Sequence, residues 1–271
     1  LINQNKQLLK VKIQGMGEPL INKHFFEMIN ICEENGVFVE TITNGSLLTE
    51  NAIENIFKSK MIYRVSISID GATKEVFEKI RVRSNFDVVI DNVKNLSKQI
   101  KYKKKNINLR AMCLLQKQNF HQFEDIIFLC KNLGFNELEF QVQMTGWGKS
   151  EWENINQKQD INFNNLKNIE DMKNIINKYN DKSFKASFVE TNLLSEKNKC
   201  SYPWHNPYIS ANGSVVSCCM IGDPSVNNYG NINDTNFNKI WNSKDYLELR
   251  NSIINHKLKD FCKNCYKNPS Q

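Results

Sequence analysis

The sequence predicts an α/β fold followed by a small cysteine-rich module, and three observations lead to this prediction. Short apolar runs of strand length recur from residue 10 to about residue 143. Segments whose apolar residues repeat with helical spacing separate these runs. Five cysteines then occur in the last quarter of the chain. Because strands that alternate with helices require right-handed crossovers, the first part is expected to form a parallel sheet, open or closed as a barrel.

Ordinary start and stop residues bound several of the predicted elements. Thr49 can cap one helix, and Gly36 and Gly134 follow two others as stop residues. The expected strands are 11–14, 37–43, 64–70, 107–115, 137–143 and 184–190. The expected helices are 23–34, 50–59, 86–98, 121–133 and 166–179, and another near 246–254 in the cysteine-rich segment. The polar segment 145–165 is expected to be a loop or insertion.

The predicted strands alternate apolar and polar residues, although a parallel strand covered on both faces is usually apolar throughout. In the third strand, Val65 and Ile67 fall on one face, and Ser66 and Ser68 fall on the other. The apolar face is expected to pack against the helices. A ligand-filled barrel interior explains the polar face best, and a half-exposed sheet is the alternative.

Three consecutive strands end in polar or glycine-rich segments, at the carboxyl ends where ligands bind in such folds. Glycines lack a side chain and therefore let the backbone approach a ligand closely. A glutamate beside them would accept a hydrogen bond from an ammonium group. Ordinary tight turns are the competing explanation. The three segments are Gly15-Met16-Gly17-Glu18-Pro19-Leu20, Thr43-Asn44-Gly45 and Ser68-Ile69-Asp70-Gly71.

The composition is that of an ordinary globular protein, with 271 residues, 40% hydrophobic and 24% charged, and a net charge of +7. The basic run at Lys101 and Lys103–Lys105 lies where a helix ends, so a solvated helix terminus is favoured over a nucleic-acid patch. No apolar stretch approaches the roughly 20 residues that span a membrane. The chain shows no secretory leader and starts at Leu1, which indicates a processing product or fragment, and we expect a cytoplasmic protein.

The eight cysteines divide into two groups. Cys32, Cys113 and Cys130 lie among apolar residues and are expected to act as small core hydrophobes. The other five occur beside polar, glycine and proline residues, and a reducing compartment favours metal binding over disulfides for them. Within this second group Cys219 is a weaker candidate, because two adjacent cysteines share one tetrahedral site only with strain.

Four of the later cysteines have the spacing of a metal or iron–sulfur site. Cys262 and Cys265 form a C-x2-C pair, and 17 residues separate Cys200 from Cys218. A hairpin turn at Gly213 would carry Cys218 back towards Cys200. Four thiolates suit both a structural zinc ion and an iron–sulfur cluster, so the spacing leaves the two open.

The glycine segment and the third strand resemble those of radical S-adenosylmethionine (SAM) enzymes. In that family, a segment like Gly15–Pro19 contacts the methionyl amine of the cofactor, and a strand like Val65–Gly71 contacts the same molecule. Arg81 matches an arginine that neutralises the cofactor carboxylate, whereas pairing with Glu78 at the surface is the alternative. The resemblance implies cofactor contacts at Gly15, Gly17, Glu18, Asn44, Ser68, Asp70, Arg81 and Gln141, with Gln143 as a weaker candidate.

The cysteine spacing, together with Pro203-Trp204 and Trp241-Asn242, resembles the SPASM/twitch extension of the same family, and the single-cluster twitch version is the closer match. The resemblance implies a partial (β/α)6-type parallel barrel over 1–194 that lacks its first strand. It implies a cysteine-rich α+β domain over 195–271. Within that domain, an auxiliary 4Fe–4S cluster would be held by Cys200, Cys218, Cys262 and Cys265.

The resemblance implies an oxidoreductase or modifying enzyme in which a 5′-deoxyadenosyl radical abstracts hydrogen. Its cofactors would be SAM and 4Fe–4S clusters. Its partners would be a peptide or small-molecule substrate and an electron donor such as a flavodoxin or ferredoxin, with no nucleic acid and no membrane.

The C-x3-C-x2-C loop that binds the catalytic cluster of the family does not occur in these residues, so an N-terminal part is expected to be missing. A non-catalytic homologue that binds a peptide or cofactor is one alternative. An unrelated barrel enzyme with a structural zinc is the other.

Overall fold

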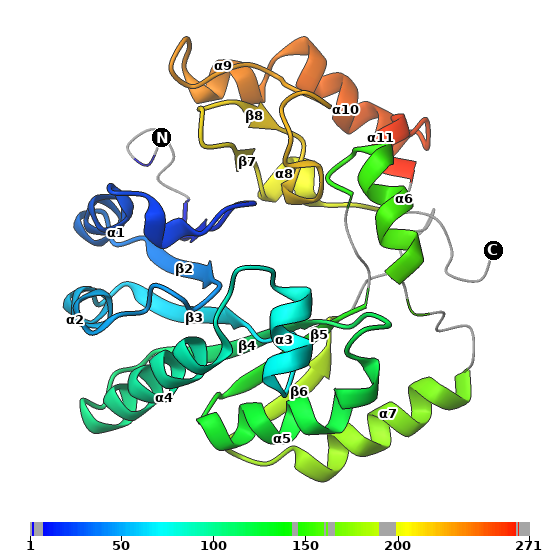
Figure 1. The fold of residues 1–271 in the computed structure, drawn as a ribbon. Coiled ribbons are helices and arrows are strands. Elements are labelled where there is room, and N and C mark those ends of the chain that lie inside the picture. The colour runs from blue at the N-terminus through cyan, green and yellow to red at the C-terminus, as the bar shows by residue number, and fades with distance from the viewer. Residues whose placement is uncertain are drawn as a thin grey trace. The chain divides into compact units, whose positions relative to one another are not determined.

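The computed structural model describes residues 2, 8–142, 146–159, 161, 166–189, 199–263 and 265, with the backbone alone for 166–169. The chain divides into two compact units, whose elements are drawn in Figure 1. The sheet unit comprises Ile2–Gln143 and Asp160–Val189. The cysteine unit comprises Met144–Gln159 and Glu190–Gln271, together with Leu1.

The described part of the sheet unit contains six parallel strands in the order of the chain, β1-β2-β3-β4-β5-β6. A sequential order without reversal is the arrangement of a barrel sector and differs from that of a doubly wound sheet. The predicted class, a partial parallel barrel, is therefore confirmed. The strands are β1 (Lys10–Ile13), β2 (Phe38–Thr43), β3 (Ile62–Ser68), β4 (Asn108–Leu114), β5 (Glu137–Gln141) and β6 (Lys185–Phe188).

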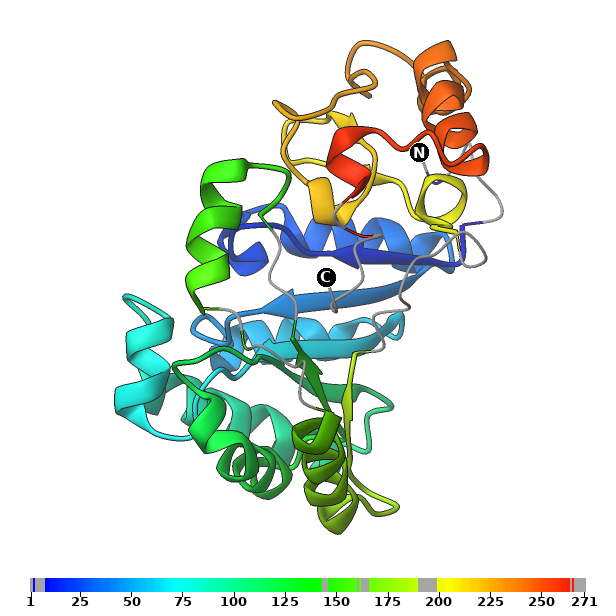
Figure 2. The ribbon, with the colours of Figure 1, turned by 90° about the vertical axis from the view of Figure 1, so that its right-hand side faces the viewer.

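Long helices cover the apolar face of this sheet, as Figures 1 and 2 show. Beneath them, Val65 and Ile67 of β3 and Phe140 of β5 are fully buried. Strand alternation thus predicts the helix-facing side correctly, because burial against the helices favours apolar side chains there. The covering helices are α1 (Phe25–Glu34), α2 (Glu50–Lys58), α4 (Phe86–Tyr102), α5 (Phe123–Leu133) and α7 (Leu166–Tyr179).

The predicted helix ends are confirmed by the local backbone. Thr49 caps α2 by accepting a hydrogen bond from the backbone N–H of Ala52. Gly36 and Gly134 adopt positive φ angles of 65° and 81° after α1 and α5, a conformation in which glycine carries no steric penalty. The buried Cys32, Cys113 and Cys130 pack as core residues, as expected.

Among the described residues between β1 and β6, two α-helices lie outside the predicted elements. The helix α3 (Lys74–Ile80) buries only Phe77, so its apolar repeat is too short to be recognised. The helix α6 (Ser150–Gln159) corrects the prediction of a loop over 145–165. None of the α6 side chains is buried, and its favourable features are acidic residues in the first turn and Lys158 in the last. Apolar periodicity therefore gave no sign of it.

The other face of the sheet carries a layer of buried charge. Arg110 of β4 pairs with Glu40 of β2 at 2.5 Å and with Glu139 of β5 at 2.9 Å. The Arg110 Nε donates to Ser66 Oγ of β3 at 3.0 Å, and Lys12 of β1 approaches Glu40 at 3.5 Å. At this level the polar side chains satisfy one another, and the ligand expected on the polar face stays a prediction. A ligand is expected nearer the carboxyl ends of the strands.

The cysteine unit surrounds a small apolar core. Its hairpin consists of β7 (Tyr208–Ile209) and β8 (Val215–Val216), and Gly213 in the turn has φ +86°, as a hairpin turn there requires. A Cβ on Gly213 would lie 2.6 Å from Asn231 Oδ1, so this turn needs glycine on steric grounds as well. The remaining elements are α8 (Tyr202–His205), the 3-10 turn η4 (Cys219–Ile221), α9 (Phe237–Trp241), α10 (Lys244–Ile254) and α11 (Asp260–Lys263). The core residues are Val215, Phe237, Ile240, Tyr246, Leu249 and Ile253.

The helix α6 groups with the cysteine unit. Lys149, just before α6, pairs with Asp223 at 2.6 Å. Gly148 lies so close to Val226 that a Cβ would come within 2.8 Å of it. A segment between the last two strands of the sheet is therefore part of the cysteine unit, while the division at residues 194 and 195 stays a prediction.

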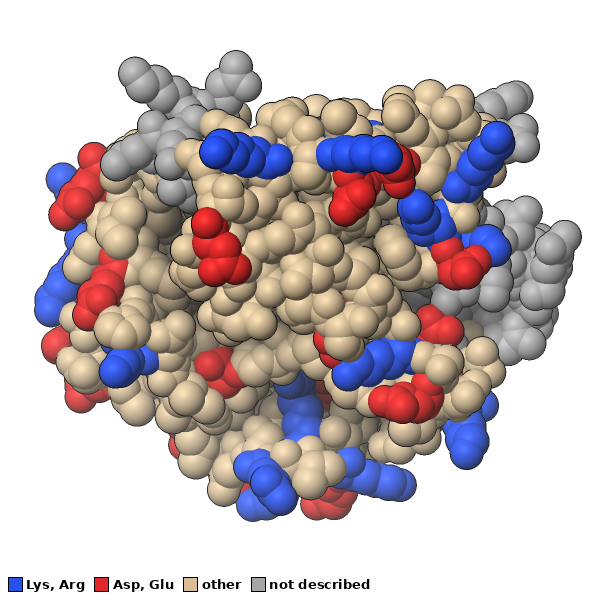
Figure 3. All heavy atoms as spheres, turned by 90° about the horizontal axis from the view of Figure 1, so that it is seen from above, with Lys and Arg blue, Asp and Glu red and all other residues tan. Residues whose placement is uncertain are grey.

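The surface mixes charges of both signs. Figure 3 shows acidic and basic side chains interspersed on one face of the molecule. In the basic run after α4, Lys105 donates to the backbone carbonyl of Phe57 at 2.6 Å, and Lys103 lies 5.1 Å from the Phe57 ring. No helix within the described ranges is long and apolar enough to cross a membrane.

Candidate cofactor site and cysteine cluster

The glycine segment after β1 is anchored to the end of β2 by Glu18. The Oε1 of Glu18 accepts hydrogen bonds from Thr43 Oγ1 at 2.7 Å and from the backbone N–H of Leu20 at 3.2 Å. Its Oε2 accepts from the backbone N–H of Asn44 at 2.7 Å. The carboxylate therefore joins two of the three predicted strand-end segments. A carboxylate offers about four lone-pair sites, so it can still accept from a ligand.

Space for a ligand lies beside the glycines of this segment. Gly15 and Gly17 are exposed, and a Cβ added to Gly17 would meet no atom within 4 Å. Next to them, Asn44 Oδ1 accepts from the backbone N–H and the hydroxyl of Ser46, which shapes the turn after β2. Gly45 in this turn has φ +82°, and a Cβ there would lie 3.1 Å from Ile67. The sequence thus places glycine both where the backbone is open and where it is strained.

Asp70 and Arg81 form a pair at the end of β3. The Nε and a terminal nitrogen of Arg81 both contact Asp70 Oδ2 at 2.7 Å. Asp70 Oδ1 accepts from the backbone N–H of Leu114, and its side chain is only 5% exposed. The alternative partner Glu78 instead accepts from the backbone N–H of Phe86. Asp70 therefore fixes the position of Arg81, and the alternative pairing of Arg81 with Glu78 is not the one found.

Two features that hold this edge together were not predicted. Asn119 is fully buried, and its Nδ2 donates to the backbone carbonyls of Asp70 and Leu114 at 3.0 and 2.9 Å. Gly71 lies against the start of α3, where a Cβ would be 2.6 Å from the backbone N of Phe77. An asparagine in a polar loop gives no sequence sign of such a role, whereas the glycine directly after Asp70 does.

The remaining predicted cofactor residues lie on the charged face of the sheet. Ser68 and Gln141 are half-buried at the ends of β3 and β5, two residues beyond Ser66 and Glu139 respectively. They share the face of the Arg110 layer, on the side of the carboxyl ends. Gln143 lies outside the described residues.

The later cysteines converge. All eight cysteines are free thiols. Burial raises the pKa of Cys218 to about 12, with Cys219 and Cys265 adding to the rise. Burial likewise raises the pKa of Cys262 to about 12, and the nearby Cys218, Cys265 and Cys200 contribute. Each of these thiols therefore lies close enough to at least one other to act on its charge, and their role as ligands of one centre stays a prediction.

This cluster differs from a preformed site for a single ion. Within the described ranges, no group of three or more His, Cys, Asp or Glu side chains has the geometry to hold a metal ion. Cys219 also belongs to the cluster, because it acts on the pKa of Cys200 and accepts a hydrogen bond from the Tyr202 side chain. The choice of Cys218 over Cys219 as a ligand stays a prediction.

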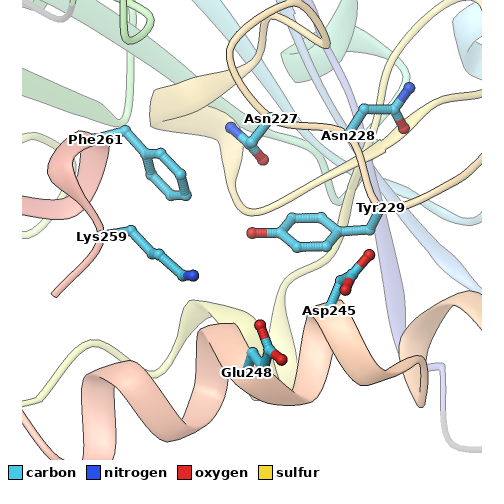
Figure 4. A pocket seen from close by; sticks show the side chains of 7 residues that line it. All are labelled: Asn227, Asn228, Tyr229, Asp245, Glu248, Lys259 and Phe261. Atoms are coloured by element: carbon cyan, nitrogen blue, oxygen red, sulfur yellow. The ribbon is translucent and has the colours of Figure 1, made fainter. Parts of the chain in front are cut away.

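The cysteine unit contains a hollow of about 280 Å³, and Figure 4 shows the side chains that line it. Tyr229 extends into it, and the pKa of Tyr229 is raised by burial and by the nearby Cys262 and Cys218. Asp245 and Glu248 on α10 supply negative charge to its wall. The lining residues are Asn227, Asn228, Tyr229, Asp245, Glu248, Lys259 and Phe261.

The fold is a parallel barrel sector with polar loops at its carboxyl ends, and a group of half-buried thiols follows it in the chain. This combination is typical of enzymes that use an organic cofactor together with a metal centre. Comparison with family models identifies the family. Residues 1–130 match the Radical SAM superfamily, and residues 200–266 match SPASM, an iron–sulfur cluster-binding domain. The chain therefore carries a radical SAM domain and a SPASM domain, and the cofactors of these domains are SAM and 4Fe–4S clusters. This excludes an unrelated zinc-binding barrel.

Individual relatives cover different parts of the chain. Mycofactocin maturase MftC of Mycolicibacterium smegmatis is 26% identical over 152 residues, which are 56% of this chain and 37% of MftC. A probable GTP 3′,8-cyclase of Sulfurisphaera tokodaii is 26% identical over 230 residues, 80% of this chain and 67% of the cyclase. The crystal structure of Streptococcus suis SuiB has a TM-score of 0.68 and 17% identity, over 93% of this chain and 60% of SuiB. The chain spans 37% to 40% of the length of the first curated relatives it matches.

Proposed function

We propose that this chain provides the SAM-binding surface and the auxiliary 4Fe–4S cluster of a radical SAM enzyme that modifies a peptide. The observation that supports the proposal is that the half-buried thiols of Cys200, Cys218, Cys262 and Cys265 lie within electrostatic range of one another. When bound, SAM and a reduced cluster supply one-electron chemistry for hydrogen abstraction from a substrate. The chain's own residues bind and orient these groups.

The carboxyl edge of the sheet suits the methionyl end of SAM. The Glu18 carboxylate would accept from the ammonium group, beside the open backbone of Gly17. Arg81, held by Asp70, would pair with the carboxylate, and Asp70 acts through Arg81 because its own oxygens are engaged. Asn44, Ser68 and Gln141 lie on the same edge and would complete the site, with the exposed Gly15 in the adjoining loop.

The buried thiols suit an iron–sulfur cluster. Because burial raises their pKa values, they hold their protons at neutral pH until a metal displaces them. Four thiolates are the usual ligand set of a 4Fe–4S cluster. Cys200, Cys218, Cys262 and Cys265 would supply that set, leaving Cys219 as a fifth thiol with a hydrogen bond from Tyr202.

Anaerobic reconstitution of the 271-residue chain tests this assignment. We expect about four iron and four sulfide ions per chain, and loss of both when Cys262 is replaced by serine. Replacement of the buried core Cys130 by serine is the matched control, and it should leave the iron content unchanged. Zinc at one ion per chain without acid-labile sulfide would contradict the proposal.

Support for a peptide substrate comes from relatives. MftC is a maturase, and one SuiB crystal structure contains the precursor peptide SuiA. A GTP-type small-molecule substrate is the second candidate, because a probable GTP 3′,8-cyclase matches 80% of the chain. Selection from a displayed peptide library and titration with GTP, both on the reconstituted chain, separate them. Tight GTP binding without peptide enrichment would overturn the peptide proposal.

We also propose that the protein is catalytic. Binding of SAM and the cluster alone would not distinguish it from a non-catalytic homologue. SAM cleavage by the protein encoded by the complete gene is the deciding assay. We expect 5′-deoxyadenosine to form under reducing conditions. Its absence, in a protein that binds SAM and cluster, would favour the non-catalytic homologue. A flavodoxin or ferredoxin is the class of electron donor to be tried first.

A further inference from the structure

Three buried polar atoms of the cysteine unit have no hydrogen-bond partner among the described residues: Ser217 Oγ, Asn227 Nδ2 and Tyr246 Oη. All three are donors. The side chain of Tyr246 is fully buried, and Ser217 is 2% exposed. Leaving a buried donor unpaired costs about 1–3 kcal/mol. Three such donors in so small a unit indicate an acceptor that the polypeptide itself does not provide.

Two of the three donors belong to the Cys218 segment, and the third lies within electrostatic range of Cys218. Ser217 directly precedes Cys218 in the chain, and Asn227 Oδ1 accepts from the backbone N–H of Ser217 at 2.8 Å. This bond directs the Asn227 carboxamide to the Cys218 segment. Tyr246 lies near both Cys218 and Cys200, because the charges of these thiols act on its hydroxyl.

Neighbouring rings and a cation hold Tyr246 in place. Its ring centroid lies 4.6 Å from that of Trp241 and 4.7 Å from that of Tyr229. The guanidinium carbon of Arg250 lies 4.8 Å from the same ring, and Arg250 Nε donates to the backbone carbonyl of Pro203. The phenol therefore has little freedom to turn towards another acceptor or towards solvent.

We infer that Ser217, Asn227 and Tyr246 donate hydrogen bonds to sulfur atoms of the auxiliary cluster and thereby raise its reduction potential. The inference rests on the proposed function, because it needs the cluster to be bound by Cys200 and Cys218. Sulfur atoms of a cluster and of its thiolate ligands are acceptors. They carry more negative charge in the reduced state, so donated hydrogen bonds stabilise that state.

Redox titration of the reconstituted chain, followed by electron paramagnetic resonance, tests the inference. The variants Tyr246→Phe and Ser217→Ala each remove a hydroxyl with little change in shape. Each should shift the midpoint potential downwards, and the double variant should shift it further. The matched control is Tyr102→Phe, because Tyr102 is 84% exposed and belongs to the sheet unit.

Deuterium exchange gives a second measurement on the same samples. The reduced cluster should show hyperfine coupling to exchangeable deuterons, and the Tyr246→Phe chain should lose part of this coupling. If Tyr246→Phe prevents cluster binding, the Ser217→Ala chain decides the question.

The outcomes separate this inference from the proposed function. An unchanged potential and unchanged deuteron coupling in cluster-loaded variants would overturn the inference and would show that buried water satisfies the donors. Absence of iron and sulfide from the unmodified chain would overturn the proposed function instead.

Discussion

At the carboxyl edge of the sheet, some side chains serve to position others. Asp70 is the clearest case, because its side chain is only 5% exposed and accepts from Arg81 and a backbone N–H, so little of the carboxylate is open to a ligand. Its role is to hold the Arg81 guanidinium, which is 28% exposed and able to reach a carboxylate. Glu18 combines both roles, since it ties Thr43 and Asn44 together and still has lone pairs to offer.

Replacing Arg81 by methionine should weaken SAM binding. Hydrogen bonds to charged groups contribute about 1.5–3 kcal/mol, which corresponds to roughly a 10- to 150-fold rise in Kd. Equilibrium binding of SAM to the reconstituted chain measures the change. Arg83→Met is the control, because Arg83 is exposed two residues further on and changes the net charge equally. Equal effects of the two variants on the Kd would show that SAM binding responds to the net charge of the chain and not to Arg81 in particular.

Replacing Gly71 by alanine should destabilise the sheet unit. The new Cβ would lie 2.6 Å from the backbone N of Phe77, and neither backbone segment can move without breaking its contacts. Overpacking of this kind costs about 1–3 kcal/mol. Urea unfolding measures the loss. Gly17→Ala is the control, because its Cβ would meet no atom within 4 Å and should leave the stability unchanged.

At the scale of elements, the charged layer links the strands that carry the site. Arg110 joins β2, β3, β4 and β5 through Glu40, Ser66 and Glu139. Burial favours the neutral form of Glu40, but Lys12 and Arg110 outweigh it and lower its pKa below the ordinary value of 4.5. The layer therefore fixes the relative positions of the strand ends just above it.

Replacing Arg110 by methionine should cost about 1.5–3 kcal/mol, because it removes the closest cation from the buried Glu40 and leaves Lys12 at 3.5 Å and the Tyr63 hydroxyl as its partners. Glu40 has a lowered pKa in the folded chain, so its contribution is present above the unfolded pKa and lost as pH falls through the folded value. The difference from the unmodified chain should thus shrink below about pH 4.5. Urea unfolding at pH 7 and pH 4 measures both effects. The exposed pair of Lys94 and Asp91 provides the control variant Lys94→Met, which should change little.

At the scale of the whole molecule, the two units differ in what stabilises them. The sheet unit has an extensive apolar core, whereas the core of the cysteine unit consists of few residues. The cysteine unit also buries an arginine against carbonyl groups and keeps three donors unpaired. A bound cluster would contribute directly to its folding.

Removing the cluster should therefore loosen the cysteine unit selectively. We expect faster amide hydrogen exchange over 199–263 after iron removal, with exchange over the strands of 38–142 unchanged. Mass spectrometry of exchanged peptides from the loaded and stripped chains measures this. Uniformly faster exchange in both units, or no change in either, would contradict the expectation that the cluster stabilises only the cysteine unit.

Much of this fold could be predicted from the sequence. The alternation in β3 identifies its buried face, and Thr49 and Gly134 mark helix ends through local backbone chemistry. The helix α6 could not be predicted in the same way, because no side chain of it is buried and burial creates the periodic signal. Asn119 was missed for a related reason, since its contacts are specific to one buried position.

The sequence by itself determined the parallel strand–helix order, the core faces, the cysteine spacing and the family resemblance. These features are written in local periodicity and in fixed distances along the chain. Only the tertiary structure decided that Asp70 holds Arg81, that Arg110 meets Glu40 across 70 positions, and that Tyr246 is buried beside the thiols. Such pairings depend on strand register and on side-chain packing between segments far apart in the chain, and neither is encoded in a local pattern.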